Sequence, residues 1–213
     1  MSEFCPTDTA SSSPNWTIFD ATMWKIFPES WGGGRQRLRD YKDAFVMHNR
    51  QAIKVAAARY NLPPELVAGT CWAEAGGMPD FIDGTAFRVR SFENNYMFGW
   101  LSPPEKTSFG WVSVQLRTAA RTLGLDPSTM SQEQFWELSQ CLERDSYNID
   151  LAARHLRQLA DHDGYQTVGL EEVRVIGARY NRGMDISMQA VMRDTSYGDN
   201  IVKKWQHLHQ LIQ

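Results

Sequence analysis

The segment that most constrains the fold runs from Asn61 to Gly77 and has the sequence NLPPELVAGTCWAEAGG. Proline is tolerated in the first turn of a helix, because its missing N–H would have no partner there, so a helix is expected to begin near Pro63 or Pro64. Glycine just past the last periodic residue is a common left-handed stop, so the helix is expected to end before Gly76. The segment therefore predicts a short helix whose last turn carries Glu74.

Glu74 falls on the apolar face of this predicted amphipathic helix. It follows Val67, Thr70 and Cys71 at offsets of three, four and seven residues, which share one side of a 3.6-residue period. Partial burial and the negative end of the helix dipole are both expected to raise the pKa of the carboxyl toward neutrality. Such a group suits general acid catalysis. A solvated surface glutamate is the commoner alternative, and helix geometry alone does not separate the two.

Composition narrows the class of protein. With 213 residues and 42% hydrophobic content, the chain is long enough for one full core, and one domain plus an arm is expected. A net charge of -3 lacks the basic face that nucleic acid requires. The sequence has no glycine-rich phosphate fingerprint, no CxxC pair and no HExxH, so neither a cofactor nor a metal site is predicted.

The three cysteines are odd in number and widely spaced, which argues against a disulfide framework. Cys71 and Cys141 are predicted to be small core residues, and Cys5 lies in the polar N-terminal stretch. The chain has no apolar run of membrane-spanning length and no basic region followed by an apolar one. We therefore expect neither a membrane span nor a secretory signal.

Residues 1–34 differ in composition from residues 35–213, so we predict an N-terminal arm followed by a single domain. The arm is polar and turn-rich at first, and a run of three glycines that ends at Gly34 is typical of a flexible joint. Between these stretches lie several large apolar residues: Trp16, Phe19, Trp24, Ile26, Phe27 and Trp31. Packing on its own domain is favoured, and packing on a partner is the alternative.

Helical periodicity dominates the remainder. Further helices are expected over Arg39 to Tyr60, Val114 to Leu125, Asn148 to Leu159 and Glu171 to Tyr180. Another is expected to begin at a capping box at Ser131 and to continue through Leu142. A final helix is expected through Ile201, Val202, Trp205, Leu208 and Ile212. Alternation in TAFRVRSF predicts a small antiparallel β-insert from about residue 85 to 112. The predicted class is mainly α (α+β), with the β-insert after Glu74.

Four stretches in this order resemble the lysozyme-like superfamily, and within it the lytic transglycosylases and goose-type lysozymes. They are PPELVAGTCWAEAGG, SFGWVSVQLRTAA, NIDLAARHLRQL and ARYNRG, and they lie between Leu62 and Trp205. The resemblance implies that Glu74 is the catalytic acid. It also implies that Tyr180 and Asn181 hold an N-acetylated sugar.

The second stretch resembles the strand and helix that line the substrate cleft of the family, so Ser108, Gly110, Ser113 and Gln115 are the candidate substrate-binding residues. The chain departs from the family at three points. About 36 residues separate Glu74 from Gly110, more than in the usual transglycosylases, so an enlarged β-insert is expected. Ala75 stands where a serine commonly follows the catalytic glutamate. Many transglycosylases have a glutamine three positions after the glycine, where this chain has Ser113, with Gln115 two positions further on.

Glycosidic cleavage requires protonation of the leaving oxygen and stabilisation of an oxocarbenium-like sugar. Glu74 suits the first task. For the second, the candidate carboxylate is Asp83, ranked ahead of Asp80 and Glu93, although a plain turn aspartate is the commoner role. The N-acetyl oxygen of the sugar is the alternative. The segment Asp161–Gly164 resembles a calcium loop, but Leu159 and Leu170 occupy required ligand positions, so a helix-ending turn is predicted.

The resemblance implies a peptidoglycan glycan-strand hydrolase, either a muramidase or a lytic transglycosylase. Peptidoglycan lies outside the cytoplasm, so without a signal the protein would reach the periplasm or cell wall of a target bacterium by another route. One route is a phage endolysin, and the favoured one is an antibacterial effector with a secretion carrier and an immunity protein. A non-catalytic glycan-binding module and a chitinase or chitosanase on the same fold are the alternatives.

Overall fold

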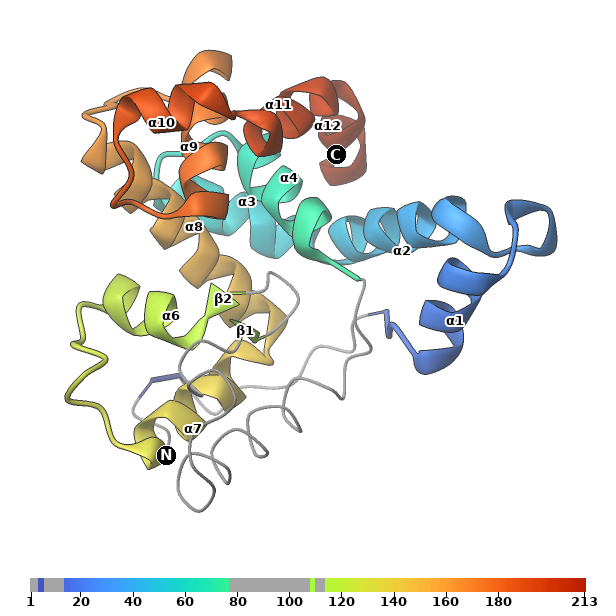
Figure 1. Ribbon diagram of the computed structural model, residues 1–213, viewed down its shortest axis with the longest axis horizontal. Helices are drawn as coiled ribbons and strands as arrows, with labels where there is room; N and C mark the ends of the chain where they lie inside the picture. Colours follow the sequence, from blue (N-terminus) through green and yellow to red (C-terminus); the bar gives the residue numbers. More distant parts are fainter. Residues whose placement is uncertain (1–3, 6–13, 77–107, 110–113) are drawn as a thin grey trace. The chain divides into compact units, whose positions relative to one another are not determined.

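A computed structural model describes residues 4–5, 14–76, 108–109 and 114–213 of the chain (Figure 1). These residues are mainly helical, which confirms the predicted fold class. The helices are α1 Ile18–Ile26, η1 Glu29–Trp31, α2 Gly34–His48, α3 Arg50–Arg59, α4 Pro64–Glu74, α6 Leu116–Leu123, α7 Gln132–Leu142, α8 Asp145–His162, α9 Leu170–Arg182, α10 Met188–Arg193, α11 Ser196–Lys203 and α12 Trp205–Ile212. Within the described ranges, no helix has the length and apolar character needed to span a membrane.

The chain divides into two compact units, each made of two separate segments. The first unit comprises Met1–Phe45 and Glu74–Asn148, and the second comprises Val46–Ala73 and Ile149–Gln213. The boundaries fall inside α2, α4 and α8. The predicted division between an arm at 1–34 and a domain at 35–213 stays a prediction.

In the first unit, the N-terminal aromatic segment contains a helix that the sequence pattern did not predict. α1 begins at a capping box, in which the Thr17 hydroxyl accepts from the backbone N–H of Asp20 and the Asp20 carboxylate accepts from that of Thr17. Asp20 also pairs with Arg37 of α2 at 2.6 Å. Trp16 is buried, and its ring centroid lies 4.7 Å from that of Tyr41. The expectation that this segment packs on its own chain is confirmed at Trp16.

The cysteines require a correction. Cys5 and Cys141 form a disulfide between residues 136 positions apart, with their Cα atoms 5.8 Å apart. Cys141 is buried in the core, as predicted, but it is bonded to Cys5, which contradicts the expectation that the chain has no disulfide framework. The expectation against a disulfide was wrong because the pairing depends on tertiary proximity, which spacing along the chain does not reveal. Cys71 is buried, as predicted.

Two short strands precede α6. Strand β1, Ser108–Phe109, pairs antiparallel with β2, Val114–Gln115, so that Ser108 lies opposite Gln115. The rest of the predicted β-insert lies outside the described residues. The helix predicted from Val114 begins at Leu116, because Val114 and Gln115 belong to β2.

Two local helix signals were predicted correctly. Ser131 caps α7, and its hydroxyl accepts from the backbone N–H of Gln134, whose side chain accepts from the Ser131 N–H. The predicted turn after α8 is also present, because the helix ends at His162 and Gly164 adopts a left-handed φ of 77°. Both features depend on residues within one turn of each other.

The second unit contains a close crossing of α9 and α11. A Cβ atom on Gly177 of α9 would lie 2.6 Å from the Cα of Gly198 in α11, closer than such atoms come in proteins. The side chain of a larger residue at either position would push the helices apart. The absence of a side chain at both glycines therefore allows α11 to pack closely against α9.

A buried ion pair connects the end of α8 to the end of α9. The Arg179 guanidinium donates to both carboxylate oxygens of Asp163, at 2.5 and 2.7 Å, and the two side chains are 3% and 5% exposed. Arg179 also donates to the carbonyls of Met184 and Ile186, at 2.9 and 3.0 Å. One side chain thus orders the loop that follows α9.

Two predicted helices are each broken into two. The helix expected over Arg39 to Tyr60 is α2 and α3, with a break at Asn49, where ψ is 9°. The expected final helix is α11 and α12, with a break at Lys204, where ψ is 5°. Apolar spacing continues across both breaks, which is why the sequence predicted single helices.

Candidate functional site

Glu74 is the last residue of α4, the helix predicted around it. The helix begins at Pro64, and Gly76 follows its end with a left-handed φ of 80°, both as predicted. Residues 65–71 are all buried, so this part of α4 is covered on every side, and the prediction of an amphipathic helix was wrong. Glu74 is half-buried at the point where this coverage ends.

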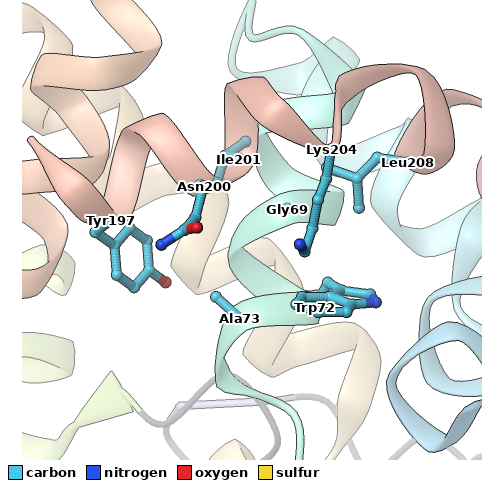
Figure 2. A pocket seen from close by; sticks show the side chains of 8 residues that line it. All are labelled: Gly69, Trp72, Ala73, Tyr197, Asn200, Ile201, Lys204 and Leu208. Carbon is cyan, nitrogen blue, oxygen red and sulfur yellow. The ribbon is translucent and has the colours of Figure 1, made fainter. Parts of the chain in front are cut away.

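A pocket of about 290 Å³ lies in the second unit between α4 and the pair α11 and α12 (Figure 2). The last α4 residue that lines the pocket is Ala73, which directly precedes Glu74 in the chain. The lining residues are Gly69, Trp72, Ala73, Tyr197, Asn200, Ile201, Lys204 and Leu208. Its size suits a single sugar unit or a group of similar bulk.

Gly69 allows α11 and α12 to approach α4 at the base of the pocket. A Cβ atom there would lie 2.5 Å from Cγ2 of Ile201 and 3.1 Å from Cδ1 of Leu208. Ile201 and Leu208 lie on either side of the break at Lys204, so the bend turns both side chains toward α4. The apolar base of the pocket depends on this contact.

One wall of the pocket is formed by Trp72 and Lys204. The Lys204 ammonium lies over the Trp72 ring, 4.7 Å from the ring centroid, as Figure 2 shows. The negative face of an indole ring attracts a cation at this distance. Lys204 is the break residue between α11 and α12, so the bend in the chain directs its side chain over the ring.

The opposite wall is formed by Tyr197 and Asn200, whose side chains point toward each other in Figure 2. The Tyr197 ring contacts Tyr180 of α9, with centroids 5.9 Å apart, and Tyr180 in turn lies 5.8 Å from His155 of α8. Burial lowers the pKa of His155 from 6.5 to about 4, and a hydrogen bond with Gln158 opposes this shift. His155 is therefore neutral at pH 7 and serves as a packing residue.

Comparison with known proteins finds no matching family model, no matching curated protein and no matching solved structure.

One of the predicted substrate residues lies next to a residue of the pocket. Tyr180 contacts the pocket residue Tyr197, although it does not itself line the pocket. Asn181 is exposed near the end of α9, and Gln115 is exposed at the start of α6. Their predicted roles, like that of Ser108 in β1, stay predictions. Asp83, Gly110 and Ser113 lie outside the described residues.

Four polar or aromatic residues of the pocket were missed by the sequence analysis: Trp72, Tyr197, Asn200 and Lys204. Three of them had a usable signal, since Tyr197, Asn200 and Lys204 recur at helical offsets of three and seven. The sequence analysis did not use this signal, because it considered only the apolar residues of the predicted final helix. For Trp72 the sequence gives only its closeness to Glu74.

Proposed function

We propose that this protein cleaves the glycan strand of peptidoglycan, at the β-1,4 bond between N-acetylmuramic acid and N-acetylglucosamine. The observation that carries the proposal is the position of Glu74, a half-buried carboxyl on the last turn of a buried helix. This position is the one that the resemblance to lysozyme-like enzymes requires of the catalytic acid. The helix also contributes Trp72 and Ala73 to a sugar-sized pocket.

In the proposed reaction, the protonated Glu74 carboxyl donates its proton to the glycosidic oxygen as the bond to the anomeric carbon breaks. The oxocarbenium-like sugar then requires a nucleophile. In a muramidase that nucleophile is water, with Asp83 as the candidate second carboxylate. In a lytic transglycosylase it is the 6-hydroxyl of the same sugar, which gives a 1,6-anhydro product. Glu74, ionised after the first step, accepts the proton of either nucleophile.

The test compares the wild-type protein with Glu74→Gln on purified cell walls. The amide has the size of the carboxyl but has no proton of suitable acidity to donate, so we expect glycan cleavage to fall by a factor of 10² to 10⁴. Glu133→Gln is the matched control, because Glu133 is exposed in the first turn of α7 and far from α4 in the sequence. Clearing by Glu74→Gln equal to that by the wild type would contradict the proposal.

Product analysis by mass spectrometry separates the chemical outcomes. Anhydro ends indicate a lytic transglycosylase, and reducing ends indicate a muramidase. Cleavage of chitin in preference to peptidoglycan would instead indicate a chitinase. Binding to cell walls without clearing by the wild type or by Glu74→Gln would indicate a non-catalytic binding module.

We further propose that the protein acts outside the cytoplasm, as a bacteriolytic effector delivered into the periplasm of a target cell. The disulfide between Cys5 and Cys141 supports this location, because disulfides persist in oxidising compartments. The exposed apolar side chains of Phe19, Ile26 and Trp31 offer a surface for a secretion carrier. The producing cell would then need an immunity protein, and release of a phage endolysin is the other route.

Directed expression tests the location. We expect killing when the protein is exported to the periplasm, no killing by exported Glu74→Gln, and no killing from the cytoplasm. Equal toxicity in both compartments would contradict the proposal.

A further inference from the structure

Lys204 is a cation whose described contact is an aromatic ring rather than a carboxylate. Five arginines there, Arg37, Arg59, Arg157, Arg174 and Arg179, have a carboxylate within ion-pair distance. For Lys204 no such partner is found among the residues that the structure describes, and its contact is the face of Trp72. Its half-buried side chain lines a pocket rather than extending into solvent.

The rest of the pocket complements a molecule that carries one anionic group. The described lining residues include no acidic side chain that would repel an anion. Ile201 and Leu208 form an apolar base, whereas Asn200 offers an amide that both donates and accepts hydrogen bonds. This combination suits a sugar with an acetamido group, a small apolar substituent and a carboxylate.

We infer that Lys204 is a specificity-determining residue, which selects glycans with a carboxylate on the 3-O-lactyl arm over neutral chitin-like glycans. The inference rests on the proposed function for the class of substrate. Muramic acid differs from glucosamine by this arm, so a cation at this pocket distinguishes the two sugars. The charge comes from the lactyl carboxylate itself on strands without peptides, or from a carboxylate of the attached peptide on strands that carry them.

The first experiment measures binding in the Glu74→Gln background, so that no cleavage is needed. N-acetylglucosamine, N-acetylmuramic acid, the neutral methyl amide of N-acetylmuramic acid, and muramyl dipeptide are titrated separately. Binding is followed by the NMR shift of the Trp72 indole N–H, identified by its loss in Trp72→Phe. A charge-assisted contact predicts that N-acetylmuramic acid binds about tenfold more tightly than the methyl amide. The muramyl dipeptide reports whether a peptide carboxylate serves equally well.

The matched variants are Lys204→Met and Lys203→Met, which remove the same charge from adjacent positions. Lys203 is exposed and does not line the pocket. We expect Lys204→Met to abolish the tenfold preference of N-acetylmuramic acid over its methyl amide. We expect Lys203→Met to keep the preference and Lys204→Arg to retain most of it. The preference should also shrink at high salt, since the site is partly open to solvent.

Two results would overturn the inference. One is an acid-to-amide preference that survives in Lys204→Met, and the other is the absence of any shift at the Trp72 indole with all four probes. These outcomes are distinct from failure of the proposed function. If the wild type degrades cell walls and the Lys204 variant keeps its preference, the function stands and the inference fails. If the preference depends on Lys204 but no glycan is cleaved, the pocket belongs to a binding module.

Discussion

Substitution of Asp163 by Asn should destabilise the fold strongly. The change keeps the size of the side chain but leaves the Arg179 guanidinium, 3% exposed, without its counter-charge. Removal of one partner from a buried ion pair costs about 3–5 kcal/mol, because the remaining charge is desolvated and uncompensated. Two hydrogen bonds from Arg179 to the loop carbonyls remain, so we expect a loss of about 3 kcal/mol, at the lower end of that range.

The matched control is Asp161→Asn, two residues away. Asp161 pairs with Arg157 at 2.9 Å, but its carboxylate is 61% exposed. Surface ion pairs of this kind contribute roughly 0–1 kcal/mol, because water screens the charges. The two variants differ mainly in the burial of the lost charge, which isolates the effect of desolvation.

Urea unfolding followed by far-ultraviolet circular dichroism measures both effects. With an m value of about 2–3 kcal/mol/M, a loss of 3 kcal/mol lowers the midpoint by about 1–1.5 M for Asp163→Asn. The midpoint for Asp161→Asn should fall by less than about 0.5 M. If the two midpoints agree within error, Arg179 is not buried as described and the argument from desolvation is refuted.

Three further predictions concern the cross-link, the pocket and pH. Cys141→Ser should lower the free energy of unfolding by up to about 5 kcal/mol, since the disulfide with Cys5 closes a loop of 136 residues. Addition of reductant to the wild type should lower its melting temperature to that of Cys141→Ser. Gly69→Ala should destabilise the fold by about 1–3 kcal/mol, because the new methyl group would meet Ile201 at 2.5 Å, and sugar shifts at the Trp72 indole should weaken. Burial lowers the pKa of His155 to about 4, so the unfolded chain binds more protons between pH 6.5 and 4. Stability should therefore fall by about 3 kcal/mol as the pH drops through this window, and His155→Gln should remove that part of the slope in pH-dependent melting. An unchanged melting temperature of Cys141→Ser would contradict the first prediction. Undiminished sugar shifts in Gly69→Ala would contradict the second, and an unchanged pH slope in His155→Gln would contradict the third.

Part of the candidate site could be predicted from sequence because its signals are local. The proline start and glycine stop of α4 placed Glu74 on the last helical turn, and the structure puts it there. Tyr180 was likewise placed near the end of its helix, where it contacts Tyr197. The pocket was not predictable, because Trp72 and Lys204 are 132 residues apart in the chain and meet only when α4 packs against α11 and α12.

A cap, proline or glycine that acts within one turn of the backbone lets a helix end be placed from the sequence, as at α4, α7 and α8. Ser131 and Gly164 are examples, since their hydrogen bonds and dihedral angles need no distant partner. The disulfide from Cys5 to Cys141, the break at Lys204 and the burial of residues 65–71 on every side were found only in the folded chain. These features depend on which surfaces meet after the chain has folded, and the spacing of residues along a helix records only which face is apolar, not what covers it.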